Sequence, residues 1–377
     1  MSNNKKLTAR MIKDLALKIG GGGGGVEIVG IAPISRFKNA PERMHPKNIF
    51  PDCKSVISVV QPIPRSTYRG ITEGTHWNNY TYYSYNRLNT AFRPMVTRQL
   101  ACFIEDHGFE AVPVYPGVPE VYPGTPAPVP GRPVADVNLN IRIAAMACGL
   151  GEIGWSKVFI HPVYGPRVRI GNILTDAELE YDEMIKPGTL CDRCMRCVPT
   201  CPGNAIPSIR EGRKITITLD DQEYSWGDVN MGRCTATHHG INYLASPFLK
   251  RFFPGFNLEI TESTMSEELA YKITHSLGGA VWRDSTEFPG GWASPYIRQI
   301  SAHCGYLAVC GAKGCIRACM EHQEKTKNIG QNTFKTPVFP EKPWQLCKPA
   351  DDPTGGVVEK VLHTELYQVP ATNPGVW

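Results

Sequence analysis

The chain has 377 residues, of which 42% are hydrophobic and 20% charged, and its formal net charge is +5. These values lie in the ordinary globular range, which excludes a largely disordered chain, and no uninterrupted apolar stretch is long enough to predict a membrane span. The positive charge is spread without a run of five or more Lys or Arg, so nucleic acid is not an expected partner.

The predicted elements of the first half alternate between helix and strand. They are a helix over 7–19 stopped by the glycine run 20–25, strands beginning at Val26 and Ser55, a helix from Thr97, a strand from Phe109 and a Pro-rich loop over 113–133. A helix over 141–148 then ends at Gly149, and strands follow over 157–160 and 167–175. This alternation is typical of a three-layer α/β domain.

The sequence beyond these elements separates into two further parts. We expect an α/β domain over 1–180, which binds cofactor and substrate, and a cysteine module over 181–330 with a long insertion at about 205–303. A Pro-rich tail over 331–377 is expected to pack on the surface.

Thirteen cysteines are the most unusual feature of the composition. No export signal precedes them, so a cytoplasmic location is expected, where thiols stay reduced. Their spacing is therefore interpreted as cluster or metal binding and not as disulfides. Four cysteines lie alone and are expected to pack in the interior: Cys53, Cys102, Cys148 and Cys347.

The first cysteine group is the run LCDRCMRCVPTCP, which contains Cys191, Cys194, Cys197 and Cys201. This is the C-x2-C-x2-C-x3-C-P pattern of bacterial ferredoxins, in which three cysteines bind one 4Fe-4S cluster and the fourth serves the other. Paired Cys-x2-Cys units also bind zinc. Four cysteines at this spacing before a proline favour an iron–sulfur cluster over zinc.

The second cysteine group, HCGYLAVCGAKGCIRAC, departs from that pattern but ends in the same C-x3-C step. It contains Cys304, Cys310, Cys315 and Cys319. We predict one cluster on Cys191, Cys194, Cys197 and Cys319, and the other on Cys201, Cys310 and Cys315. Either Cys304 or Cys234 completes the second cluster.

Two adjacent clusters form a path for single electrons, and a carrier alone would not need the large α/β domain in front. The stretch ACGLGEIGWSKVFIHPVYGPRVRIGNILTD, followed by CDRCMRCVPTCPGNAI, resembles the cobalamin-dependent iron–sulfur reductases. These are the reductive dehalogenases and epoxyqueuosine reductases, and YGPRVR is closer to the dehalogenase branch. The earlier HPKNIFPDCKSVISVVQPIP is similar to their N-terminal strand.

The resemblance implies a nitroreductase-like α/β domain that holds a base-off corrinoid, with a bacterial-ferredoxin-like module carrying two 4Fe-4S clusters. The clusters would reduce cobalt to Co(I), which acts on a small-molecule substrate. A ferredoxin or flavodoxin-type protein is the expected electron donor, and a homodimer is an open expectation.

The resemblance also implies roles for individual residues in front of the cysteine groups. The expected proton donor is Asp136, Tyr115 or Tyr122, although Asp136 could equally cap the following helix. Arg167 would stabilise developing negative charge, with a strand-end ion pair as the alternative. The expected cofactor contacts are Asn138, Arg142, Gly149, Gly151, Gly154, Arg167 and Gly171.

Three functions are consistent with these features. The first is reductive dehalogenation, or a related reductive cleavage of a small organic molecule. The second is tRNA modification like that of an epoxyqueuosine reductase. The third is a ferredoxin-like electron carrier that reduces a corrinoid elsewhere and binds none itself.

Overall fold

The computed structural model describes ten parts of the chain, and everything below concerns these residues. They are 7–19, 28–73, 78–115, 126–132, 137–238, 240, 242–246, 257–261, 263–278 and 309–326. The glycine run 20–25 and the predicted tail 331–377 lie outside them.

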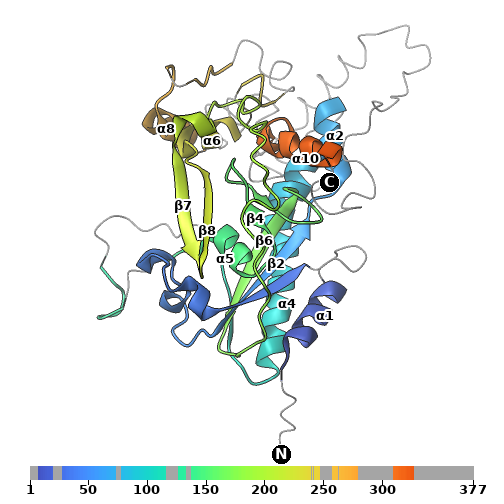
Figure 1. Ribbon diagram of the computed structural model, residues 1–377, viewed down its shortest axis with the longest axis vertical. Coiled ribbons are helices and arrows are strands. Elements are labelled where there is room, and N and C mark those ends of the chain that lie inside the picture. The colour runs from blue at the N-terminus through green and yellow to red at the C-terminus, as the bar shows by residue number, and fades with distance from the viewer. Residues whose placement is uncertain are drawn as a thin grey trace, which may run out of the picture.

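The centre of the fold is a four-stranded antiparallel sheet (Figure 1). Its strands, in spatial order, are β1 (Val29–Pro33), β2 (Ser55–Pro62), β6 (Val168–Thr175) and β3 (Ala111–Pro113). In the central pair, Val56 lies opposite Leu174 and Ile57 opposite Ile173. Both strands are buried along almost their whole length, as expected for a sheet covered on both faces.

Helices cover the two faces of this sheet (Figure 1). On one face α4 (Arg93–Glu105) packs so closely that a Cβ on Gly171 of β6 would lie 2.7 Å from Thr97, and α1 (Ala9–Ile19) lies beside α4. The other face is covered by α5 (Ile141–Ala147), which is followed by Cys148. A Cβ on Gly30 of β1 would lie only 2.0 Å from the carbonyl oxygen of Cys148, so this close approach requires glycine. The predicted mixed architecture of three layers is confirmed.

Local signals explain where these helices begin. Asn140 caps α5, because its side-chain oxygen accepts hydrogen bonds from the backbone N–H groups of Arg142 and Ile143, each at 3.2 Å. The predicted helices over 7–19 and 141–148 are found within two residues of their expected ends. In contrast, α4 begins four residues before Thr97, because it continues a helical segment that periodicity did not predict.

That unpredicted segment follows β2 and leads into α4. It comprises α2 (Arg65–Glu73), α3 (Asn78–Thr81) and two π-helical stretches, η4 (Tyr82–Asn86) and η5 (Leu88–Phe92). π-helical turns are rare and are frequent at functional sites.

Among its described residues, the second half adds two small antiparallel pairs and three helices. They are β4 (Glu152–Ile153) with β5 (Phe159–Ile160), β7 (Lys214–Leu219) with β8 (Gln222–Gly227), α6 (Met231–His238), α8 (Glu267–Gly278) and α10 (Cys315–Thr326). Short 3-10 turns are η1 (Ile34–Phe37), η2 (Glu42–Met44), η3 (Pro46–Asn48), η6 (Ile209–Glu211) and η9 (Cys310–Ala312).

The hairpin β7–β8 falls within the predicted insertion but packs on the α/β domain. Leu219, Tyr224 and Trp226 join the same hydrophobic core as the central sheet. Among the described helices, none is long and apolar enough to cross a bilayer.

Candidate metal centres

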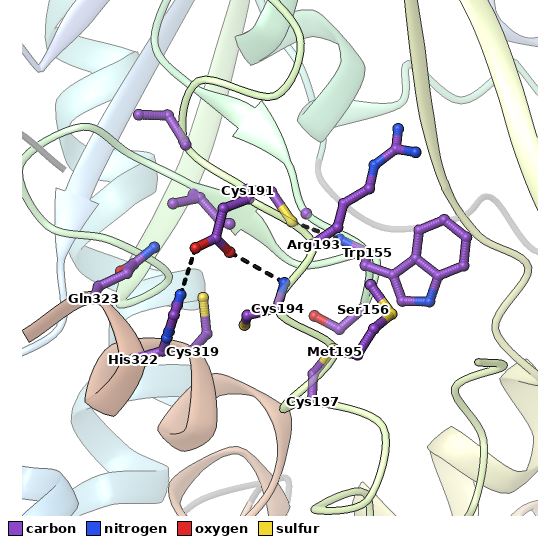
Figure 2. Close-up of a pocket in the computed structure, with 14 residues that line it drawn as sticks. Trp155, Ser156, Cys191, Arg193, Cys194, Met195, Cys197, Cys319, His322 and Gln323 are labelled. Atoms are coloured by element: carbon purple, nitrogen blue, oxygen red, sulfur yellow. Dashed lines mark hydrogen bonds and ion pairs between the residues drawn. The ribbon is translucent and has the colours of Figure 1, made fainter. Parts of the chain in front are cut away.

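Four of the predicted cluster ligands line one pocket (Figure 2). Cys191, Cys194 and Cys197 come from the loop after β6, and Cys319 comes from α10. The other residues around the pocket are Gly154, Trp155, Ser156, Ile160, Leu190, Asp192, Arg193, Met195, His322 and Gln323. We call this set of four thiols the first cysteine site. The structure thus brings α10 to a loop more than a hundred residues earlier in the chain.

The cysteine loop is held open around the first cysteine site by its own backbone. Arg193 and Met195 both have positive φ, at 56°, so the chain turns sharply between the cysteines. The backbone N–H of Trp155 donates to the sulfur of Cys191 at 3.4 Å. Such N–H to sulfur hydrogen bonds stabilise negative charge on a ligating thiolate.

An ion pair joins this loop to α10 (Figure 2). His322 Nε2 lies 2.6 Å from Asp192 Oδ2, and the other carboxylate oxygen accepts from the backbone N–H of Cys194 at 3.1 Å. Desolvation opposes ionisation of Asp192, but the hydrogen bond and charge of His322 outweigh it and lower the pKa of the carboxyl. The ligand atoms of Asp192, Cys194 and His322 also lie within 4.8 Å of one another, a spacing that a single zinc ion would accept.

A second set of four thiols, here the second cysteine site, gathers beside the first. It consists of Cys201, Cys234 from α6, Cys310 from η9 and Cys315 at the start of α10. Burial raises the pKa of Cys310 well above its usual value, and Cys315, Cys201 and Cys234 raise it further. A Cβ on Gly314 would lie 3.4 Å from the sulfur of Cys310 and 3.0 Å from Pro202. Cys304 lies outside the described residues.

The two cysteine sites are neighbours because α10 contributes to both. Cys315 and Cys319 are four residues apart, which places them about 6 Å apart along the helix axis. Burial raises the pKa of Cys197 in the first site to about 12, and Cys201 of the second site is among its neighbours. The arrangement can therefore hold two metal clusters that are separated by about one turn of α10.

The four glycines expected to contact a cofactor each pack closely against protein atoms on the side where a Cβ would lie. A Cβ on Gly149 would be 2.3 Å from the Glu183 carbonyl oxygen, and one on Gly151 would be 2.2 Å from the Ile160 carbonyl oxygen. A Cβ on Gly154 or Gly171 would be 2.7 Å from a neighbouring side chain. Gly149 also has a φ of 75°, which a side chain would strain. Gly154 in addition lines the pocket of the first cysteine site, so its predicted cofactor contact stays a prediction.

The remaining predicted residues are Tyr115, Tyr122, Asp136, Arg167 and Asn138. Tyr115 is 72% exposed at the end of β3, and Tyr122 and Asp136 lie outside the described residues. Arg167 donates to the Ile63 carbonyl oxygen at 2.9 Å, and its guanidinium lies over the Tyr164 ring. Asn138 is half-buried, and its backbone N–H donates to the Arg43 carbonyl oxygen.

Arg142 lies between the second cysteine site and a tyrosine that the sequence did not single out. Desolvation lowers the pKa of Arg142, while the charges of Tyr85, Cys234 and Cys315 oppose that effect. The residue as a whole is exposed, but its guanidinium is desolvated and donates to the Lys157 carbonyl oxygen at 2.7 Å.

Tyr85 belongs to the π-helical stretch η4 and is surrounded by basic side chains. The Arg169 guanidinium lies 5.0 Å from the centre of its ring, and the ring of His238 lies 4.9 Å away. The sequence signal available was the run NNYTYYSYN, four tyrosines within six residues, which has no clear helical or strand pattern.

Comparison with known proteins adds evidence from sequence. No protein-family model matches the chain. A tetrachloroethene reductive dehalogenase of Dehalobacter restrictus is 40% identical over 73 residues, which are 19% of this chain and 13% of that protein. An epoxyqueuosine reductase of Synechococcus sp. is 38% identical over 72 residues, 19% of this chain and 22% of the relative. One of Lactococcus garvieae is 25% identical over 171 residues, 45% of this chain and 43% of the relative.

A solved epoxyqueuosine reductase aligns with a TM-score of 0.42 and 14% identity over 85% of this chain and 82% of that structure. The sequence matches carry the assignment, although they span less than half the length of each of these relatives. They confirm the predicted kinship: this chain is a relative of the reductive dehalogenases and epoxyqueuosine reductases.

Proposed function

We propose that the chain is a corrinoid-dependent iron–sulfur oxidoreductase that reductively cleaves a small organic substrate, most plainly by removing a halide. The observation that carries the proposal is the pair of four-cysteine sites joined by α10. Relatives named as reductases support it from the sequence side.

The residues present fit two 4Fe-4S clusters. Each site offers four thiols, the donor set that such clusters use, and none of the eight is needed for a disulfide. Burial raises the pKa of Cys197 to about 12 and of Cys234 to about 11, so these thiols are protonated at neutral pH when no iron is bound. Cluster binding would therefore release protons, and the thiolate charge would be neutralised by iron.

Electrons would enter at the first cysteine site and leave from the second. Cys194 is exposed, so a protein donor of the ferredoxin or flavodoxin type can approach that cluster closely. Arg142 and Lys157 contribute positive charge near Cys234 of the second site. Positive charge stabilises the reduced cluster, which favours transfer from the first site to the second.

A corrinoid, when bound, would supply a cobalt centre that becomes strongly reducing after accepting electrons. The expectation of a corrinoid rests on the similarity to the reductive dehalogenases and epoxyqueuosine reductases. The chain's own contribution would lie near Arg142, which is exposed beside the second cysteine site and close to Tyr85. Substrate would need a proton there, and we assign its delivery to Tyr85, with Asp136 as the remaining candidate.

Anaerobic purification and reconstitution test this function directly. The expected protein is brown, contains about eight iron and eight sulfide per chain and binds one corrinoid. It should consume tetrachloroethene or a bromophenol with a low-potential reductant, and Cys194→Ala should lose about half the iron and all turnover. A colourless protein, or one that contains zinc, would refute the cluster assignment.

The epoxyqueuosine reductase alternative is supported by a sequence match over 171 residues to a protein of that name. It predicts salt-dependent binding of tRNA and reduction of its epoxyqueuosine. Iron and sulfide without corrinoid, together with reduction of a separate corrinoid protein, would instead identify an electron carrier. Each result replaces the dehalogenation proposal.

A further inference from the structure

Gln323 is a buried polar side chain with an unusual position. It is 3% exposed and lines the pocket of the first cysteine site, four residues after Cys319 on the same face of α10 (Figure 2). Within the described part of the chain, neither its Nε2 nor its Oε1 has a hydrogen-bond partner. A buried amide left in this state has lost the hydrogen bonds that water gives it in the unfolded chain, so it is seldom retained without a use.

The lining of the pocket around Gln323 indicates which hydrogen-bond acceptor a bound group would supply. Its walls are mostly apolar, from Ile160, Leu190 and Trp155, and its remaining lining includes the four thiols. A cluster bound there would present sulfide and thiolate sulfurs, which accept hydrogen bonds. The Oε1 atom would be repelled by that negative charge, so the amide would turn its Nε2 toward the cluster.

We propose that the side-chain amide of Gln323 donates a hydrogen bond to a sulfur of the first cluster and raises its reduction potential. The proposal rests on the proposed function only in requiring a cluster at this site. Reduction adds one electron to the cluster, so an N–H donor stabilises the reduced form more than the oxidised form. Gln323 is thus a positioning and tuning residue, and it does not contact substrate.

The test is a redox titration of the reconstituted holoprotein, followed by electron paramagnetic resonance. Gln323→Met removes the donor at similar volume, and Gln323→Leu removes it with a different shape. Both should lower the potential of the first cluster and leave the second unchanged. A tenfold fall in the ratio of reduced to oxidised cluster at a fixed potential is the expected size, which equals 59 mV for one electron.

Met320→Leu is the matched control, because Met320 is a fully buried residue of the same helix without a donor. It should leave both potentials in place. Unchanged potentials in both Gln323 variants, or an equal shift in the control, would overturn the proposal. Wild-type protein that assembles no cluster at the first site would instead refute the proposed function.

A measurement on the unmutated protein decides the case if the variants fail to assemble. Wild-type protein labelled with 15N in the glutamine side chains should show a 15N coupling to the reduced first cluster. Absence of that coupling contradicts the hydrogen bond regardless of what the variants do. The backbone N–H of Trp155, which donates to Cys191, carries no 15N label and so does not contribute to this coupling.

Discussion

Glu152 holds the beginning of the cysteine loop. The residue is 6% exposed, and its carboxylate accepts from the backbone N–H groups of Gly188 at 2.7 Å, Leu190 at 2.9 Å and Cys191 at 3.3 Å. A buried carboxylate is stable here because three donors surround it. Glu152 therefore fixes the position of Cys191 from the β4–β5 pair.

Glu152→Ala should destabilise the loop, because it leaves three N–H groups without their acceptor, and that of Leu190 is buried. We expect a loss of about 2–4 kcal/mol in the free energy of unfolding and faster release of iron from the first site to a chelator. Thermal unfolding and chelator-release rates measure the two effects. Glu178→Ala, at an exposed position, is the control and should change neither.

Cys148 gives a prediction about alkaline pH. It is fully buried after α5, and burial raises the pKa of its thiol from 9.0 to about 12. The folded state thus holds the proton more tightly than the unfolded state, so this contribution is complete below pH 9 and is lost as pH rises toward 12. Between pH 8 and pH 10.5 the stability advantage of wild type over Cys148→Ala should fall by about 2 kcal/mol.

Urea unfolding of both proteins at the two pH values checks this. Because all other titrating groups are the same in both proteins, their effects cancel in the difference between the two free energies of unfolding. A difference that stays constant with pH would show that Cys148 titrates normally in the folded state. The buried position of Cys148 and Cys53 agrees with the packing role expected for these lone cysteines.

At the scale of single residues, the sequence predicts a shared role only for residues that lie close together in the chain. The first cysteine group lies within eleven residues, so its common role is visible in the chain. Gln323 and Glu152 are different, because each acts on residues that folding brings near. Neither is distinguishable in sequence from an ordinary polar residue on a helix or strand.

At the scale of elements, periodicity predicted the helices and strands that follow a simple amphipathic or buried pattern. It missed α2 to η5, since a π-helical stretch has no fixed period, and it missed the docking of the β7–β8 hairpin. Arg36 makes that docking: it donates to the carbonyl oxygens of Ala147 and Asp182, each at 2.6 Å, and to the Asp220 carboxylate at 3.0 Å. Its partners are up to 184 residues away, beyond any sequence pattern.

The π-helical stretch η4 leads to a prediction about Tyr85. If Tyr85 delivers the proton, Tyr85→Phe should lower kcat by about 10²–10⁴-fold, while iron and corrinoid content and the reduction of both clusters stay at wild-type values. Steady-state turnover of the organohalide probe measures it. Tyr83→Phe is the control in the same stretch, because Tyr83 is 40% exposed and should be tolerated.

A turnover of Tyr85→Phe within twofold of wild type would remove Tyr85 from the reaction. Asp136 would then be the donor to test by Asp136→Asn. The Arg169 guanidinium lies 5.0 Å from the centre of the Tyr85 ring, and Tyr85 also interacts electrostatically with Arg142 near the second cysteine site. This position is the reason for expecting the large effect.

At the scale of the whole molecule, the two cysteine sites are assembled from segments that are distant in the chain. The loop at 191–201, α6, η9 and α10 each supply cysteine thiols. Arg317 of α10 hydrogen-bonds Thr72 of α2, which fixes α10 against the first half of the fold (Figure 1). Repeated C-x3-C spacing allowed the exchange of one ligand between the groups to be predicted. For the fourth ligand of the second site the sequence left Cys304 and Cys234 as alternatives, because Cys234 stands alone in the sequence.

The choice between Cys234 and Cys304 is the sharpest test of this assembly. Cys234 is half-buried in α6. Burial and, to a lesser extent, the neighbouring Cys201 raise the pKa of its thiol to about 11. Cys234→Ser should therefore lower the iron content by about half and remove the signal of the second cluster. Cys304→Ser should leave iron and both signals intact, since the four thiols already gathered satisfy one cluster. Loss of iron in Cys304→Ser with a normal Cys234→Ser would reverse the assignment and require the segment around Cys304 to lie against Cys310.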